Sequence, residues 1–255
     1  MERRNFLKNT YASAVFPLGL GSGLLSNRQE ELAGRELFEL RTYEMKFRAD
    51  SSVLVNYLKT VLRPALTHIG STGFYVFNEY GKSEPRKVHV LIGYSNPSSF
   101  VEAQFIRFDP GFLKNAKSYN SIPPDKALYH RYSSSLMTAF AGMPKIGSIE
   151  DKAKLFELRI YEGYSEDAVR RKIQMFDVEE IDLFVRLGLT PIFFGDMVIG
   201  PYRPCLAYML AFKDMNERNA RWKTFADHPD WHTMRVKTEY ANTVSNIRKT
   251  FLTLG

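Results

Sequence analysis

Two strand-like segments of the sequence carry the same pair of charged residues. Glu39 and Arg41 lie two positions apart in the first segment, and Glu157 and Arg159 do so in the second. Because side chains alternate across a strand, residues two positions apart point to one face and can pair. An arginine can hold an anion or a carbonyl group, and a carboxylate or a tyrosine can move protons. The same pattern also fits an ion-pair ladder that sets strand register, or a solvated face.

Three further side chains extend these pairs. Tyr43 and Tyr161 follow on the same face of each strand, and His89 lies in an alternating segment where it could act as an acid or base. The second strand-like region has Ala207 in place of His89, so the first region is the better candidate for histidine chemistry. A hydrogen-bonded structural histidine is the alternative. The candidate ligand-binding residues are Glu39, Arg41, Tyr43, His89, Glu157, Arg159 and Tyr161.

Other chemical motifs are weak. His228 and His232 have the i, i+4 spacing of helical metal ligands, but Pro229 marks a first helical turn, which places His228 at the helix cap. No third ligand is evident, so we predict no metal site and no cofactor. Cys205 is the single cysteine, so no intrachain disulfide can form, and its apolar surroundings predict a buried, unreactive thiol.

The charged strands belong to an internal repeat. Residues 37–44 and 155–162 differ at one position of eight and begin 118 residues apart, and Gly70 and Gly188 repeat at the same offset. A repeat of this length indicates two copies of one module. We predict modules over residues 35–140 and 154–255, joined by a linker over 141–153 that is rich in turn formers and charge.

The elements that position these residues follow one order in both modules, β-α-β-β-α-β. This is the order of the ferredoxin-like unit, an α+β fold in which two helices cover one face of an antiparallel sheet. Pro64 is expected to kink the first helix or to begin a second segment. The first module is predicted to contain strand 37–43, helix 51–69, strands 73–80 and 87–94, helix 99–107 and a strand within 128–138. The second is predicted to contain strand 154–162, helix 166–187, strands 191–199 and 204–212, helix 214–226, a short helix from 229 and a strand near 244–253.

The N-terminus resembles an export signal. Arg3 and Arg4 are followed by an apolar stretch over about residues 12–25, which is the pattern of a twin-arginine signal and predicts delivery to a bacterial periplasm. A basic N-terminus with a chance apolar stretch is the alternative. The stretch is shorter than the roughly 20 residues of a spanning helix, so no stable membrane span is expected. The formal net charge is +7, but the basic residues are scattered, which argues against nucleic-acid binding.

The ordered set of these motifs resembles the NIPSNAP family. The set comprises the Glu-Leu-Arg-x-Tyr strand, the glycine-closed helix, the hairpin, and the stretches Asp-Pro-x-Phe at 109–112 and His-Pro-x-Trp at 228–231. The likeness covers about residues 36–140 and 154–255. It implies a dimeric α/β barrel, in which two ferredoxin-like sheets close face to face, but it implies no settled activity.

The sequence therefore predicts an exported NIPSNAP-like protein of two tandem modules. Helices are expected to cover the Phe38 face of the first strand, so that the charged faces of the two sheets meet around a small-molecule cavity. The expected ligand is small and anionic or aromatic, and a homo-oligomer is compatible with the fold. Two alternatives are a cofactor-independent enzyme of the α/β-barrel kind, such as an oxygenase or isomerase, and a haem-binding barrel.

Overall fold

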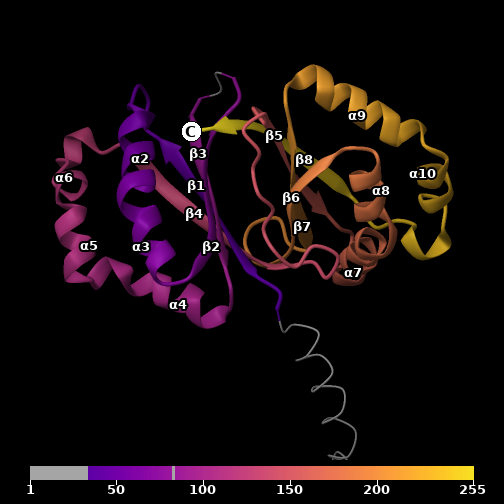
Figure 1. Cartoon of the computed structure of the whole chain (residues 1–255), viewed down its shortest axis with the longest axis horizontal. Helices are drawn as coiled ribbons and strands as arrows, with labels where there is room; N and C mark the ends of the chain where they lie inside the picture. Colours follow the sequence, from indigo (N-terminus) through magenta and orange to yellow (C-terminus); the bar gives the residue numbers. More distant parts are fainter. Residues whose placement is uncertain (1–33, 82–83) are drawn as a thin grey trace, which may run out of the picture. The chain divides into compact units, whose positions relative to one another are not determined.

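Eight strands of the chain close into one antiparallel barrel (Figure 1). The computed structural model describes residues 34–81 and 84–255, and every structural statement below concerns this part of the chain. The strands are β1 (Leu37–Met45), β2 (Ser71–Glu79), β3 (Lys87–Tyr94), β4 (Tyr129–Ala139), β5 (Leu155–Glu162), β6 (Thr190–Ile199), β7 (Cys205–Phe212) and β8 (Asn246–Leu254). Their order around the barrel is β1-β3-β2-β8-β5-β7-β6-β4, and β4 closes the ring by pairing with β1.

The two halves of the chain have matching strand neighbours. The first half contributes the run β4-β1-β3-β2, and the second contributes β8-β5-β7-β6. Pairing of β2 with β8 and of β4 with β6 joins the halves. A single chain thus closes the barrel, and the predicted β-α-β-β-α-β order is present in each half.

Helices flank the strands of their own half (Figure 1). The first half contains α2 (Ser51–Tyr57), η1 (Leu58–Leu62), α3 (Arg63–His68), α4 (Pro97–Phe105), η2 (Ile106–Phe108), α5 (Pro110–Asn115), α6 (Lys117–Asn120) and η3 (Pro124–Lys126). The second half contains α7 (Glu166–Met175), η4 (Phe176–Glu180), α8 (Ile181–Arg186), α9 (Met215–Asp227), α10 (Pro229–Met234) and η5 (Thr238–Tyr240).

The first long helix of each half has the same internal irregularity. The segments η1 and η4 are π-helical, and their first residues, Leu58 and Phe176, lie 118 positions apart. Pro64 stands in the first turn of α3, directly after η1, so the predicted second segment is confirmed. Glycines with positive φ follow both helices, Gly70 at +91° and Gly188 at +76°, as their sequence positions predicted.

Two layers of buried side chains lie on opposite faces of the barrel wall. The inner layer draws on both halves and includes Phe38, Leu40, Phe77, Phe156 and Phe193. The outer layer consists of one cluster in each half, which fills the contact between the strands of that half and its helices. The interior of an eight-stranded barrel has room for little more than its own side chains, and most of these are apolar here.

This layering corrects the predicted orientation of the charged strands. The Phe38 face of β1 points into the barrel, whereas Tyr43 packs with the helices of the first half. Tyr161 likewise packs with the helices of the second half. The two charged faces therefore do not meet between the sheets, and the inter-sheet space is filled mainly by apolar side chains.

The export signal and spacer predicted over residues 1–34 lie outside the described residues, apart from Gly34. Among the residues that are described, no helix has the length and apolar character needed to cross a membrane.

Candidate functional site

Glu157 is the centre of a buried polar network between β5 and the helices of the second half. Its side chain is fully buried and accepts hydrogen bonds from two arginines and a tryptophan. Arg159 donates from Nε at 2.8 Å, and Arg218 of α9 donates from Nε and Nη2 at 2.9 and 2.8 Å. Trp222, also on α9, donates from its indole nitrogen at 2.8 Å. Burial opposes ionisation of Glu157, but the hydrogen bonds from Arg218 and the charge of Arg159 outweigh it and lower its pKa.

Arg159 extends this network toward two tyrosines. Its guanidinium carbon lies 3.7 Å from the ring centroid of Trp222, a cation–π contact. Its Nη1 donates to the Tyr161 hydroxyl at 3.1 Å, and the Tyr208 hydroxyl donates to the same oxygen at 2.8 Å. Burial raises the pKa of Tyr208 well above its usual value, so this phenol is neutral at ordinary pH.

A second buried ion pair lies beneath the first long helix of the second half. Lys172 Nζ is 2.5 Å from Glu180 Oε2, and both side chains are almost completely buried. The ammonium also lies 3.3 Å from Met175 Sδ and 4.4 Å from the ring centroid of Phe176. Burial raises the pKa of Glu180, although the Lys172 charge and hydrogen bond act in the opposite direction. Glu180 is therefore the carboxyl group of this region that most readily keeps a proton.

The first half has apolar residues where the second half has this polar cluster. At the 118-residue offset, Lys172 and Glu180 correspond to Leu54 and Leu62, which are buried in the core of the first half. By the same offset Arg218 corresponds to Phe100. Our sequence analysis did not single out these residues, yet reading the repeat for its differences instead of its identities would have found them.

In the first half, Glu39 and Arg41 form a buried ion pair in which one negative charge matches one positive charge. Arg41 donates to both carboxylate oxygens of Glu39, from Nε at 2.7 Å and from Nη2 at 2.9 Å. Tyr94 donates to Glu39 at 2.8 Å, and Ser134 also donates to it. Desolvation opposes ionisation of Glu39, but the hydrogen bond and charge of Arg41 prevail and lower its pKa. Tyr43 packs beside this pair, with its ring 5.0 Å from that of Tyr129.

His89 lies apart from both rows. It faces the barrel interior, where its Nδ1 is 3.0 Å from the Thr42 hydroxyl and its Nε2 is 3.5 Å from Glu79 Oε1. Because Thr42 and Arg41 are neighbours in β1, their side chains point to opposite faces. The structure therefore contradicts the expectation that His89 joins Glu39 and Arg41. It brings the predicted residues together in two separate clusters and leaves His89 in a third place.

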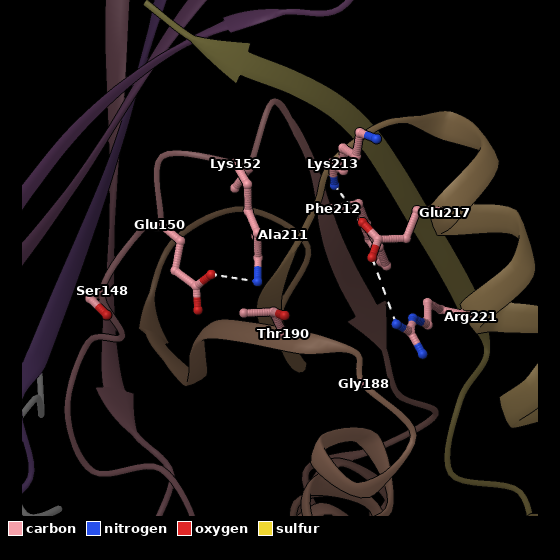
Figure 2. Close-up of a pocket in the computed structure, with 11 residues that line it drawn as sticks. Ser148, Glu150, Lys152, Gly188, Thr190, Ala211, Phe212, Lys213, Glu217 and Arg221 are labelled. Carbon is pink, nitrogen blue, oxygen red and sulfur yellow. Dashed lines mark hydrogen bonds and ion pairs between the residues drawn. The ribbon is translucent and has the colours of Figure 1, made fainter.

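A pocket lies against α9, where its lining residues Glu217 and Arg221 are the chain neighbours of Arg218 and Trp222 (Figure 2). Its volume is about 230 Å³. It is lined by Ser148, Glu150, Lys152, Ala153, Gly188, Thr190, Ala211, Phe212, Lys213, Glu217 and Arg221. Figure 2 shows the Lys152 ammonium next to the Thr190 side chain and the Arg221 guanidinium further to the right, below Glu217.

The charged side chains of the pocket contact one another, and the Lys213 backbone nitrogen donates to Glu217 Oε2 at 2.6 Å. Lys152 Nζ lies 2.7 Å from Glu150 Oε2, and both side chains are more than half exposed. Arg221 Nη2 is 3.8 Å from Glu217 Oε1, which is longer than a hydrogen bond. Gly188 allows the Arg221 guanidinium to lie against the backbone, because a Cβ at this position would stand 2.8 Å from Arg221 Cζ.

The histidines with metal-like spacing do not form a pair on one helix face. His228 caps α10, where its Nδ1 accepts from the backbone nitrogen of Asp230 at 3.1 Å. This confirms the predicted cap. Cys205 is buried, as predicted, and burial raises the pKa of its thiol to about 11.

Comparison with known proteins identifies the class of fold first. The chain is an antiparallel α/β barrel, and its fold is similar to that of a protein of Fusobacterium nucleatum named as a candidate monooxygenase. The two chains share 10% identity, the alignment covers 87% of this chain and 93% of that chain, and the TM-score is 0.57. A second candidate monooxygenase, from Lactobacillus acidophilus, shares 8% identity over 86% of this chain and 94% of that chain, with a TM-score of 0.55. At these identities the likeness concerns the fold alone.

A match to a family model is confined to the second half of the chain. Residues 156–254 match the NIPSNAP family model, so the second half is a NIPSNAP domain. A NIPSNAP-like domain protein of Burkholderia xenovorans shares 20% identity over 40% of this chain and 84% of that chain, with a TM-score of 0.36. No curated protein matches the sequence.

Proposed function

We propose that the NIPSNAP domain of the second half binds a small organic anion at the solvent-facing side of Arg218, beside the pocket on α9. The observation that carries this proposal is the number of arginines that contact the Glu157 carboxylate. Two guanidinium groups, those of Arg159 and Arg218, contact this one carboxylate, whereas in the first half Glu39 is matched by Arg41 alone.

Burial makes this imbalance informative. Charged groups removed from water cost several kcal/mol each unless they are paired. The Arg159 side chain is 8% exposed and that of Arg218 is 17% exposed, so neither is freely solvated. Arg218 is the more exposed of the two, and it is the member that a ligand from solvent reaches first. A carboxylate or phenolate there would supply the second negative charge and two hydrogen-bond acceptors.

The pocket supports a site for a ligand of metabolite size. Its wall includes Glu217 and Arg221, which are neighbours of Arg218 and Trp222 along α9. The lining holds the cations Lys152, Lys213 and Arg221 against the carboxylates Glu150 and Glu217, so three positive charges minus two negative charges leave it with a net charge of +1, which favours an anion over a cation. This placement differs from the predicted inter-sheet cavity, because apolar side chains of both halves fill most of the barrel interior.

The test uses the residue that the first half carries at the same position. Benzoate serves as the probe, and binding is followed by chemical-shift changes and by calorimetry on the full chain. Arg218→Phe leaves Glu157 with Arg159 and Trp222 and should preserve the fold while weakening benzoate binding at least tenfold. Arg186→Ala, which removes an exposed arginine of α8, is the matched control. Equal binding by wild type and Arg218→Phe would overturn the proposal, as would no saturable binding of benzoate, phenylacetate or salicylate.

A second candidate function is cofactor-independent catalysis on an organic acid or phenol. The specific observation is the buried cluster of Lys172, Glu180, Tyr161 and Tyr208, in which burial raises the pKa of the Glu180 carboxyl and of the Tyr208 phenol. Glu180 would then exchange a proton with the bound molecule. The two fold neighbours named as candidate monooxygenases are consistent with this reading. Glu180→Gln should abolish turnover of the organic acid or phenol and retain its binding. If the protein only binds such molecules, neither the wild type nor Glu180→Gln will show turnover.

We also propose that both halves are NIPSNAP-like modules and that the chain is exported through a twin-arginine-type signal to a bacterial periplasm. The repeat at residues 37–44 and 155–162 and the matching strand order support the first proposal. The Arg3-Arg4 pair supports the second. Replacing both arginines with lysine should retain the protein in the cytoplasm, as measured by cell fractionation. Unchanged distribution of this variant would count against export by this route.

A further inference from the structure

An exposed apolar surface follows the outer side of α4, η2 and α5 in the first half. Four of its residues, Val101, Phe105, Phe108 and Leu113, are 52%, 61%, 64% and 44% exposed. The first three follow a spacing of four and three residues, which places them on one side of the helical segment. The rings of Phe105 and Phe108 lie 6.4 Å apart. We name this surface the α4 face.

The second half does not have such a surface on the equivalent helix. The caps Asn96 of α4 and Asp214 of α9 lie 118 positions apart, so the two helices start in register. At this offset Val101 and Phe105 correspond to Asn219 and Lys223, and α9 presents these polar residues to solvent. A helix at this position of the fold can therefore have a polar outer side, as α9 does. The apolar residues of the α4 face are not needed to build the helix.

Basic residues surround the α4 face. The Arg107 guanidinium lies over the Phe108 ring, 5.0 Å from its centroid, and Lys114 and Lys117 are exposed on α5 and α6. Over the helical segments 51–68 and 97–126 the first half carries six basic and three acidic residues. Over 166–186 and 215–240 the second half carries nine basic and ten acidic residues. Figure 1 shows α5 and α6 on the side of their half away from β8 and the second half, and α4 along the lower edge of that half.

We propose that the α4 face docks on an anionic lipid surface. Phenylalanine, valine and leucine side chains flanked by lysine and arginine are the pattern by which surface helices enter the boundary between headgroups and acyl chains. The basic residues are complementary to anionic lipids, each being worth about a fivefold gain in binding near such a surface. A second copy of the chain is a poorer occupant, because a two-fold interface would place like charges of Arg107, Lys114 and Lys117 against one another.

The test places a reporter in the α4 face of the full chain. Cys205 is buried, so a thiol introduced by Val101→Cys can be labelled selectively with an environment-sensitive NBD group. The matched control is Val236→Cys, an exposed valine of the second half. With vesicles containing phosphatidylglycerol, the Val101 label should rise at least threefold in fluorescence and shift to the blue, while the Val236 label stays unchanged. Vesicles of phosphatidylcholine alone should give a much smaller response.

Further variants separate this docking from other causes. Lys114→Gln/Lys117→Gln should lower partitioning about thirtyfold, since two basic residues are removed. Phe105→Ser/Phe108→Ser should abolish the response of the Val101 label. Attachment to vesicles through the N-terminal segment alone would leave that label in water, and this result would overturn the proposal. A rise of the Val101 signal with protein concentration, without lipid, would instead show that a second copy covers the face and would equally overturn it.

Discussion

The buried Lys172–Glu180 pair allows a sharp test of the relation between the two halves. The pair is 2.5 Å long, with side chains 5% and 3% exposed. The first half has Leu54 and Leu62 at the corresponding positions, in the same helix–π–helix arrangement. The double substitution Lys172→Leu/Glu180→Leu therefore installs residues that this architecture already accommodates elsewhere in the chain.

The expected magnitudes follow from the desolvation of the two charges. Removing only Lys172 leaves Glu180 buried without its partner, and such a change typically costs about 3–5 kcal/mol. Replacing both charges with apolar residues of similar size is usually neutral or stabilising by about 1–4 kcal/mol. For a chain of this length, about 2–4 °C in Tm corresponds to 1 kcal/mol, so Lys172→Leu should lower Tm by roughly 6–20 °C. The double variant should match or exceed the wild type.

The pH dependence provides an independent check on the same pair. The pKa of Glu180 is raised in the fold, so the folded state binds more protons than the unfolded state above the usual carboxyl range. Its contribution to the stability of the wild type is therefore fully present at acidic pH and declines as pH rises toward the folded pKa. The advantage of Lys172→Leu/Glu180→Leu over the wild type should grow across this interval.

The assay is urea unfolding followed by circular dichroism, at pH 4 and pH 7, on the wild type, both single variants and the double variant. Coupling between the two sites should be large and should offset most of the loss caused by Lys172→Leu. The reasoning is refuted if the double variant is destabilised by the sum of the two single changes. That outcome would mean that leucine does not fit where the repeat places it, or that the charges are not paired.

Two other predictions concern groups outside this pair. Glu157→Gln should destabilise the protein by about 3–5 kcal/mol at pH 7, because Arg159 and Arg218 lose their buried counter-charge. The pKa of Glu157 is lowered in the fold, so the stability difference between the wild type and Glu157→Gln should shrink as pH falls through the folded pKa. Urea unfolding at pH 7 and pH 3 measures this difference, and a constant value would contradict the role given to the charge of Glu157. The Cys205 thiol is buried, and burial raises its pKa to about 11. At pH 8 it should therefore react with a disulfide reagent at least tenfold more slowly in the folded chain than in urea. Equal rates would disprove its burial.

The sequence alone predicted most of the elements, because their signals are local. Alternation defined strands such as Lys87–Tyr94, and the 118-residue offset transferred the assignment from one half to the other. The same offset also contained the second-half cluster, since leucine at 54 and 62 becomes lysine and glutamate at 172 and 180. The cluster is thus marked by the differences between the two copies, whereas the shared residues mark only the common fold.

Only the tertiary structure decided which face of each strand meets which layer. Alternation separates the Phe38 face of β1 from the Arg41 face, but it is symmetric and does not say which of them points into the barrel. The outcome depends on the narrow interior, which accepts apolar side chains from both halves, and on partners that are distant in sequence. Glu157 meets Arg218 and Trp222 sixty-one and sixty-five residues further along the chain. Contacts at that separation are set by how β5 and α9 pack, and no local pattern records them.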